Sequence, residues 1–241
     1  MNLVFLHGFL GSHRDYALVV AELKKQNVEF NCWAPDFFQS GPVSAAHDYQ
    51  TWTNNFLSEL KTRFKGQSCT LVGYSLGARL ALHAFLQMPQ SFDRLMLLSA
   101  NPGILIGSAE ERRAWEQKWA DCFRHQSWQS AMDEWNSQHV FQQATPRITP
   151  VEGQLQRELV ADSLSRWSLL THRYTLDDLM RLPTTTEWWF GEEDQKFMLV
   201  KAELERRKVP GHYKVIKNTG HRLPLDQAEL LSEALRTGRT R

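Results

Sequence analysis

Short apolar runs bounded by turn residues recur along the chain and predict the strands of a sheet. They stand at residues 3–6, 29–34, 69–73, 94–99, 186–190 and 213–217. Stretches with helical spacing alternate with these runs, at residues 14–25, 49–64, 76–87, 197–208 and 225–236. Repeated alternation of strand and helix predicts an α/β fold with a mostly parallel sheet and helices on both of its faces.

The alternation stops between residues 101 and 183, which predicts an insertion within a single domain covering residues 1–241. The stretch is polar with helical spacing, and it holds five of the nine tryptophans: Trp115, Trp119, Trp128, Trp135 and Trp167. An insertion that follows a strand end lies at the carboxyl edge of a parallel sheet, where ligands bind. We therefore expect a helical cap whose tryptophans mainly form its own core, some of them facing a pocket.

Composition and charge exclude several classes of protein. A chain of 241 residues, 42% hydrophobic and 23% charged, can bury the core of one α/β domain. A net charge of +1 provides no basic field for nucleic acid, and no apolar run approaches the length of a membrane span. The cysteines Cys32, Cys69 and Cys122 lack metal-ligand spacing, and their odd number argues against a disulfide framework. We expect a cytoplasmic protein that acts on a small molecule without a metal or other cofactor.

A serine between two glycines, in the stretch LVGYSLGAR, is the first candidate for chemistry. Gly73-x-Ser75-x-Gly77 follows an apolar run and precedes a helical one, a pattern typical of a sharp strand-turn-helix. The serine there adopts a strained backbone, and the glycines remove Cβ atoms that would clash with strand and helix. We predict that Ser75 is a nucleophile and that the Leu76 amide, at the helix N-terminus, is an oxyanion donor.

The ends of other predicted strands carry possible partners for Ser75. Asp194 follows the run EWWFG, and His221 follows the run YKVIKN. The first strand ends in HGFLG, where we predict that the Phe9 amide is a second oxyanion donor and that His7 holds the loop. The order nucleophile, acid, base is that of the α/β-hydrolase fold. His221 would take the serine proton while Asp194 fixes its tautomer. Glu192 and Glu193 are rivals for the role of the acid.

These residues resemble the α/β-hydrolase superfamily over nearly the whole chain, and within it the MenH family of 2-succinyl-6-hydroxy-2,4-cyclohexadiene-1-carboxylate synthases. The resemblance lies in FLHGF (5–9), LVGYSLGAR (71–79), NPG (101–103), WNSQHVF (135–141), RELVA (157–161) and GEEDQKF (191–197). It implies elimination of pyruvate from a succinyl cyclohexene dicarboxylate, with the triad abstracting a proton. At two positions where the family carries arginines that bind the substrate, this chain has Trp115 and Ser163, with Arg112, Arg113 and Arg166 nearby. Of the loop that the family has after its second strand, this chain keeps only Asp36.

Arg79 is a candidate anion-binding residue because of its position. It lies four residues after Ser75, one helical turn along a face that should be buried between sheet and cap. A charge there needs either a protein carboxylate or an anionic substrate. We expect a carboxylate-bearing substrate, a hydrogen bond to it from Tyr74, and a pocket wall above Ser75 that includes Trp135 and Phe141.

Two other classes stay open from the sequence. A carboxylic ester or thioester hydrolase would use the same triad through a Ser75 acyl-enzyme and would need nothing from Arg79. A non-catalytic binding module on this fold could dispense with a triad, whereas this chain carries all three residue types in order.

Overall fold

The computed structural model describes residues 1–145 and 150–238, and its centre is a six-stranded sheet. The strands are β1 (Asn2–Leu6), β2 (Asn31–Trp33), β3 (Cys69–Tyr74), β4 (Phe92–Leu98), β5 (Glu187–Gly191) and β6 (His212–Ile216). They lie in the order β2-β1-β3-β4-β5-β6, and every neighbouring pair is parallel. The predicted strands and the parallel sheet are therefore confirmed.

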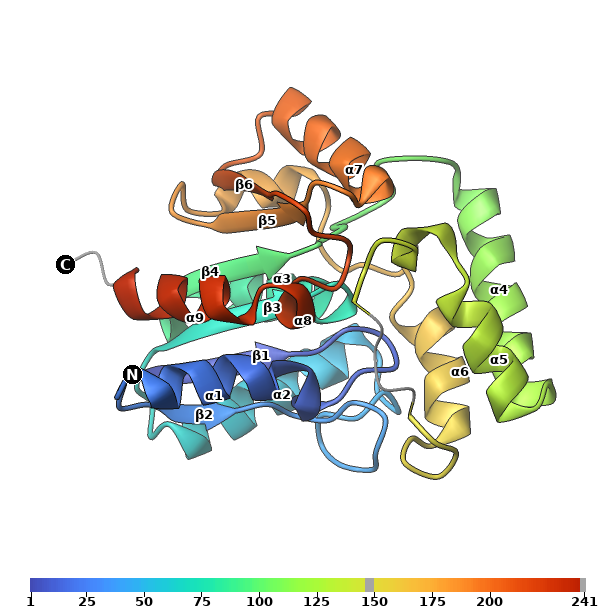
Figure 1. The fold of residues 1–241 in the computed structure, drawn as a ribbon, viewed down its shortest axis with the longest axis horizontal. Coiled ribbons are helices and arrows are strands. Elements are labelled where there is room, and N and C mark those ends of the chain that lie inside the picture. Colours follow the sequence, from blue (N-terminus) through green and yellow to red (C-terminus); the bar gives the residue numbers. More distant parts are fainter. Residues whose placement is uncertain (146–149, 239–241) are drawn as a thin grey trace.

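Helices cover both faces of the sheet because its strands are apolar on both sides. Leu3 and Phe5 belong to a core shared with α1 (Ala17–Lys25) and α9 (Ala228–Thr237), which lie in front of the sheet in Figure 1. Val4 and Leu6 face the opposite core, to which the other main helices contribute: α2 (Tyr49–Arg63), α3 (Leu76–Gln87) and α7 (Gln195–Arg206). Burial on both faces explains why these strands read as continuous apolar runs.

Two predicted helices have more complex ends than their patterns indicated. The first begins as a 3₁₀ turn, η1 (His13–Tyr16), before α1. The last is divided into α8 (Leu223–Asp226) and α9, with Gln227 between them at φ −134°. Pro224 stands in the first turn of α8, where its missing N–H costs no helical hydrogen bond.

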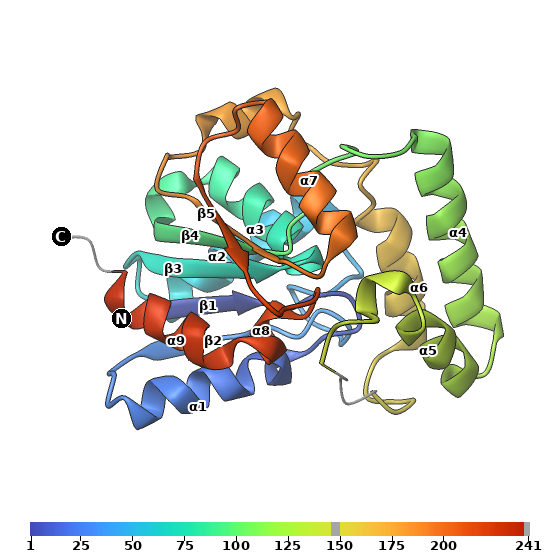
Figure 2. The ribbon, with the colours of Figure 1, turned by 45° about the horizontal axis from the view of Figure 1, so that its top comes forward.

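Residues 101–183, here called the cap segment, are mainly helical. They form α4 (Ala109–His125), α5 (Trp128–Asn136) and α6 (Arg157–Arg166), together with the 3₁₀ turns η3 (His139–Phe141) and η4 (Asp177–Arg181). A further 3₁₀ turn, η2 (Pro89–Ser91), lies outside the cap segment and precedes β4. Figures 1 and 2 both show α4, α5 and α6 beyond the end of the sheet to which the strand arrows point. The cap segment therefore stands where ligands of parallel α/β sheets bind.

The tryptophans of the cap segment divide between two settings: Trp115, Trp119 and Trp135 pack on one another within the cap segment, whereas Trp167 packs into the core of the sheet layer. Trp167 is fully buried, and its ring lies edge-on to two others: its centroid is 5.6 Å from that of Phe37 and 6.1 Å from that of Trp52. Trp135 packs on Trp119 at 4.8 Å and on Phe9 of the β1 loop at 4.6 Å. One aromatic core thus joins the cap segment to the sheet.

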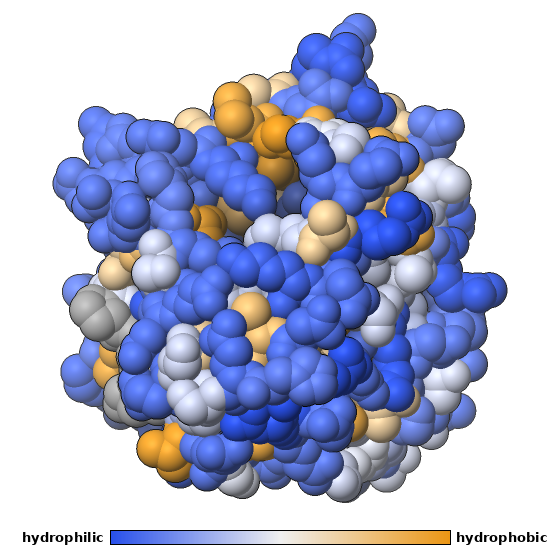
Figure 3. All heavy atoms as spheres, turned by 90° about the vertical axis from the view of Figure 1, so that its right-hand side faces the viewer, coloured by the Kyte–Doolittle hydropathy of each residue, from blue (hydrophilic) through white to orange (hydrophobic). Residues whose placement is uncertain are grey.

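The outer face of the cap segment is mostly hydrophilic, with apolar side chains around a hollow in its upper part (Figure 3). In residues 1–145 and 150–238, no helix combines the length and the apolar character needed to cross a bilayer. The same residues contain no group of three or more His, Cys, Asp or Glu side chains placed to hold a metal ion.

Candidate active site

Ser75 stands at the turn between β3 and α3 in a strained backbone conformation, with φ 52° and ψ −109°. The flanking glycines allow this turn to pack. A Cβ on Gly77 would lie 2.1 Å from the carbonyl oxygen of Leu6, and one on Gly73 would lie 2.6 Å from Ala78 Cα. Both contacts are with backbone atoms, so neither glycine can be replaced without moving α3 or β1. This turn between β3 and α3, here called the elbow, therefore fixes the hydroxyl at the N-terminus of α3.

Ser75, His221 and Asp194 form one chain of hydrogen bonds. His221 Nε2 lies 3.1 Å from Ser75 Oγ, and His221 Nδ1 lies 2.5 Å from Asp194 Oδ2. The side chains of His221 and Asp194 are 5% and 0% exposed, so water competes little for these contacts. In this arrangement the imidazole can accept the serine proton while the carboxylate stabilises the imidazolium.

The loops that carry Asp194 and His221 are held together by close backbone packing. A Cβ on Gly191 would lie 2.2 Å from the Gly220 carbonyl oxygen, so the ends of β5 and β6 approach closely. Asp194 caps α7, since its Oδ1 accepts the Phe197 amide at 3.3 Å, and the Phe197 ring lies 4.4 Å from the His221 ring. The rival acids, Glu192 and Glu193, are exposed and stand outside this chain of hydrogen bonds.

A cavity lies over Ser75, and every predicted site residue except Asp194 lines it: Phe9, Tyr74, Ser75, Leu76, Arg79, Trp135, Phe141 and His221. The Phe141 ring lies 5.8 Å from the His221 ring and 6.1 Å from Trp135. The Tyr74 ring lies 5.5 Å from His221 on the side of the elbow. The structure thus brings the predicted cap aromatics and the predicted catalytic groups to one space.

The loop after β1 is packed against the elbow. His7 is fully buried, with Nδ1 2.8 Å from the Gly8 oxygen and Nε2 3.1 Å from the Phe37 amide, so Nδ1 donates and Nε2 accepts. A Cβ on Gly8 would lie 2.7 Å from Tyr74 Cε1. This packing carries Phe9 to the cavity wall beside Leu76, the first residue of α3, whose N–H has no acceptor within the helix.

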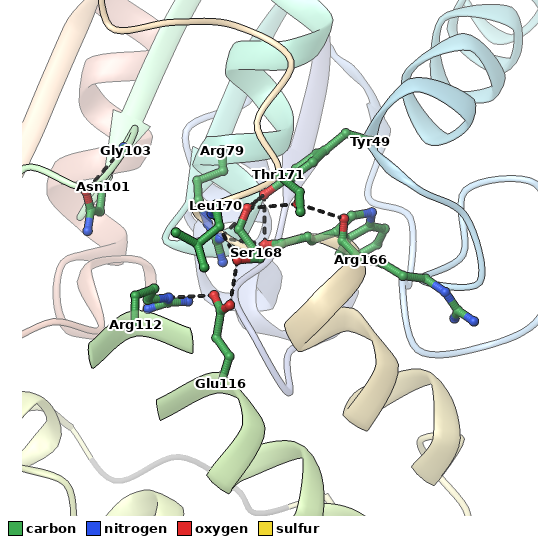
Figure 4. Close-up of polar contacts among 11 residues, drawn as sticks. Tyr49, Arg79, Asn101, Gly103, Arg112, Glu116, Arg166, Ser168, Leu170 and Thr171 are labelled. Atoms are coloured by element: carbon green, nitrogen blue, oxygen red, sulfur yellow. Dashed lines mark hydrogen bonds and ion pairs between the residues drawn. The ribbon is translucent and has the colours of Figure 1, made fainter. Parts of the chain in front are cut away.

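Arg79 reaches the cavity from α3, and neutral groups hold its guanidinium. Nη1 donates to the Trp167 carbonyl oxygen at 2.6 Å and to the Tyr49 hydroxyl at 3.4 Å (Figure 4). Within the described part of the chain, no carboxylate lies within ion-pair distance of Arg79. The positive charge of Arg79 is therefore not cancelled by an acid.

The cap segment supplies a second arginine to the cavity, one turn before the position that the family pattern indicates. Arg112 lines the wall, pairs with Glu116 at 2.5 Å and stacks over the Trp115 ring at 4.5 Å. Burial, and then the charge of Arg79, lower the pKa of Arg112. Arg166 points away from this group in Figure 4 and bonds instead to Asp162 and Ala45.

Two further cations line the cavity and had no role in the prediction. Arg222, next to His221, donates to Asn136 Oδ1 at 2.7 Å and lies 4.5 Å over the Phe141 ring. Lys196, two residues after Asp194, faces both the cavity and a neighbouring groove that also contains Arg112. Desolvation and the Arg112 charge lower the pKa of Lys196, although Asp194 opposes them. Both residues stand in the segments that carry Asp194 and His221, and this proximity in the sequence was the signal that could have identified them.

The cavity wall consequently carries an excess of positive charge. Its described lining residues include Arg79, Arg112, Lys196 and Arg222 and the carboxylate of Asp15, while Glu116 pairs with Arg112 from outside the lining. Low-dielectric walls of one charge raise the local concentration of ligands of the opposite charge. The arrangement can therefore hold an anion with several carboxylates beside a serine that has a base.

Comparison with known proteins identifies related chains and related folds. A family model described as "Alpha/beta hydrolase family" matches residues 3–234. A putative 2-succinyl-6-hydroxy-2,4-cyclohexadiene-1-carboxylate synthase of Haemophilus influenzae is 28% identical, over 98% of this chain and 96% of its own. The synthase of that name from Salmonella newport is 30% identical, over 91% and 86% respectively.

Solved structures show the same fold. The structure of MenH from S. aureus matches with a TM-score of 0.78 at 21% identity, covering 98% of this chain and 92% of that one. A malate-bound esterase from Thermogutta terrifontis matches with a TM-score of 0.75 at 18% identity, covering 98% and 88%. The predicted fold class is thereby confirmed, and its neighbours include proteins named as a MenH and as an esterase.

Proposed function

Because the chain belongs to the α/β-hydrolase family, we propose that Ser75, His221 and Asp194 are its catalytic triad and that it is a MenH-like synthase. Its substrate would be a succinyl cyclohexene dicarboxylate, from which it eliminates pyruvate to form 2-succinyl-6-hydroxy-2,4-cyclohexadiene-1-carboxylate. The reaction consumes no water and needs no acyl-enzyme. The task of the triad is then to move a proton.

In this proposal Ser75 and His221 act together as the general base. A substrate C–H proton passes to the pair, and the 3.1 Å contact allows His221 to carry the charge while Asp194 stabilises it. The amides of Phe9 and Leu76 stabilise the negative charge that develops on a substrate oxygen. The electron pair of the C–H bond forms a new ring double bond as the bond between the ring carbon and the enolpyruvyl oxygen breaks, and the departing enolpyruvate takes up one proton to become pyruvate.

The observation that favours the synthase over an ester hydrolase is Arg79, one turn from Ser75, a cavity cation to which the described residues offer no carboxylate partner. A substrate with several carboxylates uses that charge, together with those of Arg112 and Lys196, whereas a neutral ester does not. Tyr74 would add a hydrogen bond. Trp135 and Phe141 would pack against the carbon ring of the substrate.

The second candidate is a carboxylic ester or thioester hydrolase. Ser75 would attack the acyl carbon, the alcohol or thiol would leave with the proton from His221, and water would release the acid. The likeness of the fold to proteins named as esterases and as a thioesterase domain favours this reading. An ester or thioester hydrolase would make no use of the positively charged cavity wall. A non-catalytic binding module would make no use of the hydrogen bonds that join Ser75, His221 and Asp194.

A direct assay separates the two candidates. The purified chain is incubated with the succinyl cyclohexene dicarboxylate, pyruvate is followed through lactate dehydrogenase and NADH, and a panel of short aryl esters is tested in parallel. We expect pyruvate release from the wild type and a loss of roughly 10³-fold or more in Ser75→Ala. Rapid ester cleavage without pyruvate release would transfer the assignment to the hydrolase.

The matched control is Ser163→Ala, which removes another buried serine hydroxyl, one that bonds within α6 at 2.8 Å and does not line the cavity. It should release pyruvate at the wild-type rate. Undiminished turnover in Ser75→Ala would mean that another residue supplies the base.

A further inference from the structure

We propose that Tyr49 is a positioning residue for Arg79, which it holds, together with the Trp167 carbonyl, through neutral hydrogen bonds that leave the guanidinium charge available to a substrate carboxylate. The inference rests on the proposed function, since it concerns the anion site of the same cavity. It adds a residue that lies behind the cavity wall and does not touch the substrate.

The first support is the pattern of donors and acceptors around Arg79. The Tyr49 hydroxyl donates to the Trp167 oxygen at 2.8 Å, so its own oxygen is left to accept from Arg79 Nη1 at 3.4 Å. The Trp167 oxygen also accepts from Arg79 directly, at 2.6 Å. Trp167 is the C-cap of α6, where carbonyl groups lack helical partners and carry the negative end of the helix dipole. The guanidinium is therefore held by the partial charges of neutral oxygen atoms and not by the formal charge of a carboxylate.

The second support is a ring stack that fixes Tyr49. Its ring lies 4.0 Å from His83 at an interplanar angle of 21°, and 5.2 Å from His172 at 28°. The two imidazoles are joined to each other, with His83 Nε2 3.1 Å from His172 Nδ1. Only 1% of Tyr49 is exposed, so its hydroxyl has a fixed direction. His83 lies on α3 one turn beyond Arg79, which places the support and the cation on one face of the helix.

The third support is that the stack stays uncharged at neutral pH. Burial, and then the Arg79 charge, lower the pKa of His83 to about 3 and that of His172 to about 2. Burial raises the pKa of Tyr49 to about 12, although Arg79 opposes it. The groups behind Arg79 therefore neither cancel its charge nor repel the anion that it would bind.

The acid drawn beside this group in Figure 4 is already engaged. One oxygen of Glu116 pairs with Arg112, and the other accepts the Ser168 hydroxyl at 2.5 Å. Glu116 thus balances Arg112, and Arg79 is left with dipoles alone. Of these two arginines, Arg79 is therefore the one whose charge stays available to a ligand.

The test uses succinate as the probe and isothermal titration calorimetry as the measurement, so it does not depend on turnover. Four proteins are compared: the wild type, Tyr49→Phe, Arg79→Ala and the double variant. Loss of one hydrogen bond should weaken succinate binding by about three- to tenfold in Tyr49→Phe. Because Tyr49 acts through Arg79, the double variant should bind succinate no more weakly than Arg79→Ala alone.

Tyr174→Phe is the matched control. Tyr174 belongs to the same stack, 4.6 Å from His172, but its buried hydroxyl has no hydrogen-bond partner among the described residues. Its removal should leave succinate affinity unchanged. Thermal unfolding checks that both tyrosine variants keep the wild-type fold. We expect that they do, because each substitution removes a single oxygen atom.

The outcomes separate this inference from the proposed function. Equal succinate affinity in the wild type and Arg79→Ala, or no binding by the wild type, overturns the anion site and the role of Tyr49 together. A loss in Arg79→Ala with wild-type affinity in Tyr49→Phe overturns the role of Tyr49 alone. Additive losses in the double variant would show that Tyr49 acts on the fold rather than through Arg79.

Discussion

At the scale of single residues, two arginines in one cavity have opposite surroundings. Arg112 is balanced by Glu116 at 2.5 Å, whereas the Trp167 oxygen and the Tyr49 hydroxyl hold Arg79. A carboxylate 4 Å from an unbalanced cation gains on the order of 4 kcal/mol at an effective dielectric constant near 20. The same carboxylate beside Arg112 gains less, because Glu116 repels it. Arg79 should therefore dominate the recognition of anions.

This difference gives a prediction for Arg79→Ala. The variant should lower kcat/KM for the dicarboxylate substrate by about 10²- to 10³-fold, as expected when one member of a desolvated charge pair is removed. Turnover of a neutral aryl ester should change by less than about threefold. Arg166→Ala is the control, because it removes another partly buried guanidinium, one that bonds to Ala45 and Asp162 outside the cavity. Equal losses on both substrates would mean that Arg79 only supports the fold.

At the scale of elements, the sequence indicated strands and helices where apolar periodicity and burial coincide. The predicted strand at residues 29–34 is shorter in the structure, because β2 is an edge strand that pairs only with β1 and exposes Asn31 and Cys32. Ser75, Asp194 and His221, the proposed triad, could be placed because each follows a strand, and parallel strands end at one edge. Lys196 could not be assigned in this way, since its approach to Arg112 depends on how α7 and α4 pack across the cavity.

The join between β1 and α3 yields a prediction for Gly77→Ala. Its new Cβ would lie 2.1 Å from a backbone oxygen of β1, which cannot swing away as a side chain can. We expect a loss of at least about 3 kcal/mol in the free energy of unfolding, measured with urea, or no soluble protein. Gly103→Ala is the control, because its Cβ would meet only the movable end of Leu176 at 2.9 Å. Equal stability of the two variants would contradict the close packing described at the elbow.

At the scale of the whole molecule, the ring stack behind Arg79 joins the cap segment to the helices of the sheet. Tyr49 comes from α2, His83 from α3, and His172 and Tyr174 from the cap segment. The stack lies against the same aromatic core that Trp167 shares with Trp52. Stability of the whole chain is therefore coupled to the protonation of two imidazoles that are buried in neutral form.

That coupling predicts how the free energy of unfolding depends on pH. Unfolded histidine has a pKa near 6.5, while burial, and then the Arg79 charge, lower those of folded His83 and His172 to about 3 and about 2. Between these values the unfolded chain binds more protons, so stability falls as pH falls, by about 1.4 kcal/mol per pH unit for each imidazole. Urea unfolding between pH 7 and 4 should show a slope shallower by about that amount in His83→Gln, whose amide cannot titrate. Tyr174→Phe, in the same stack, removes no group that titrates in this range and should keep the wild-type slope. Parallel curves for the wild type and His83→Gln would show that His83 is not held neutral in the folded chain.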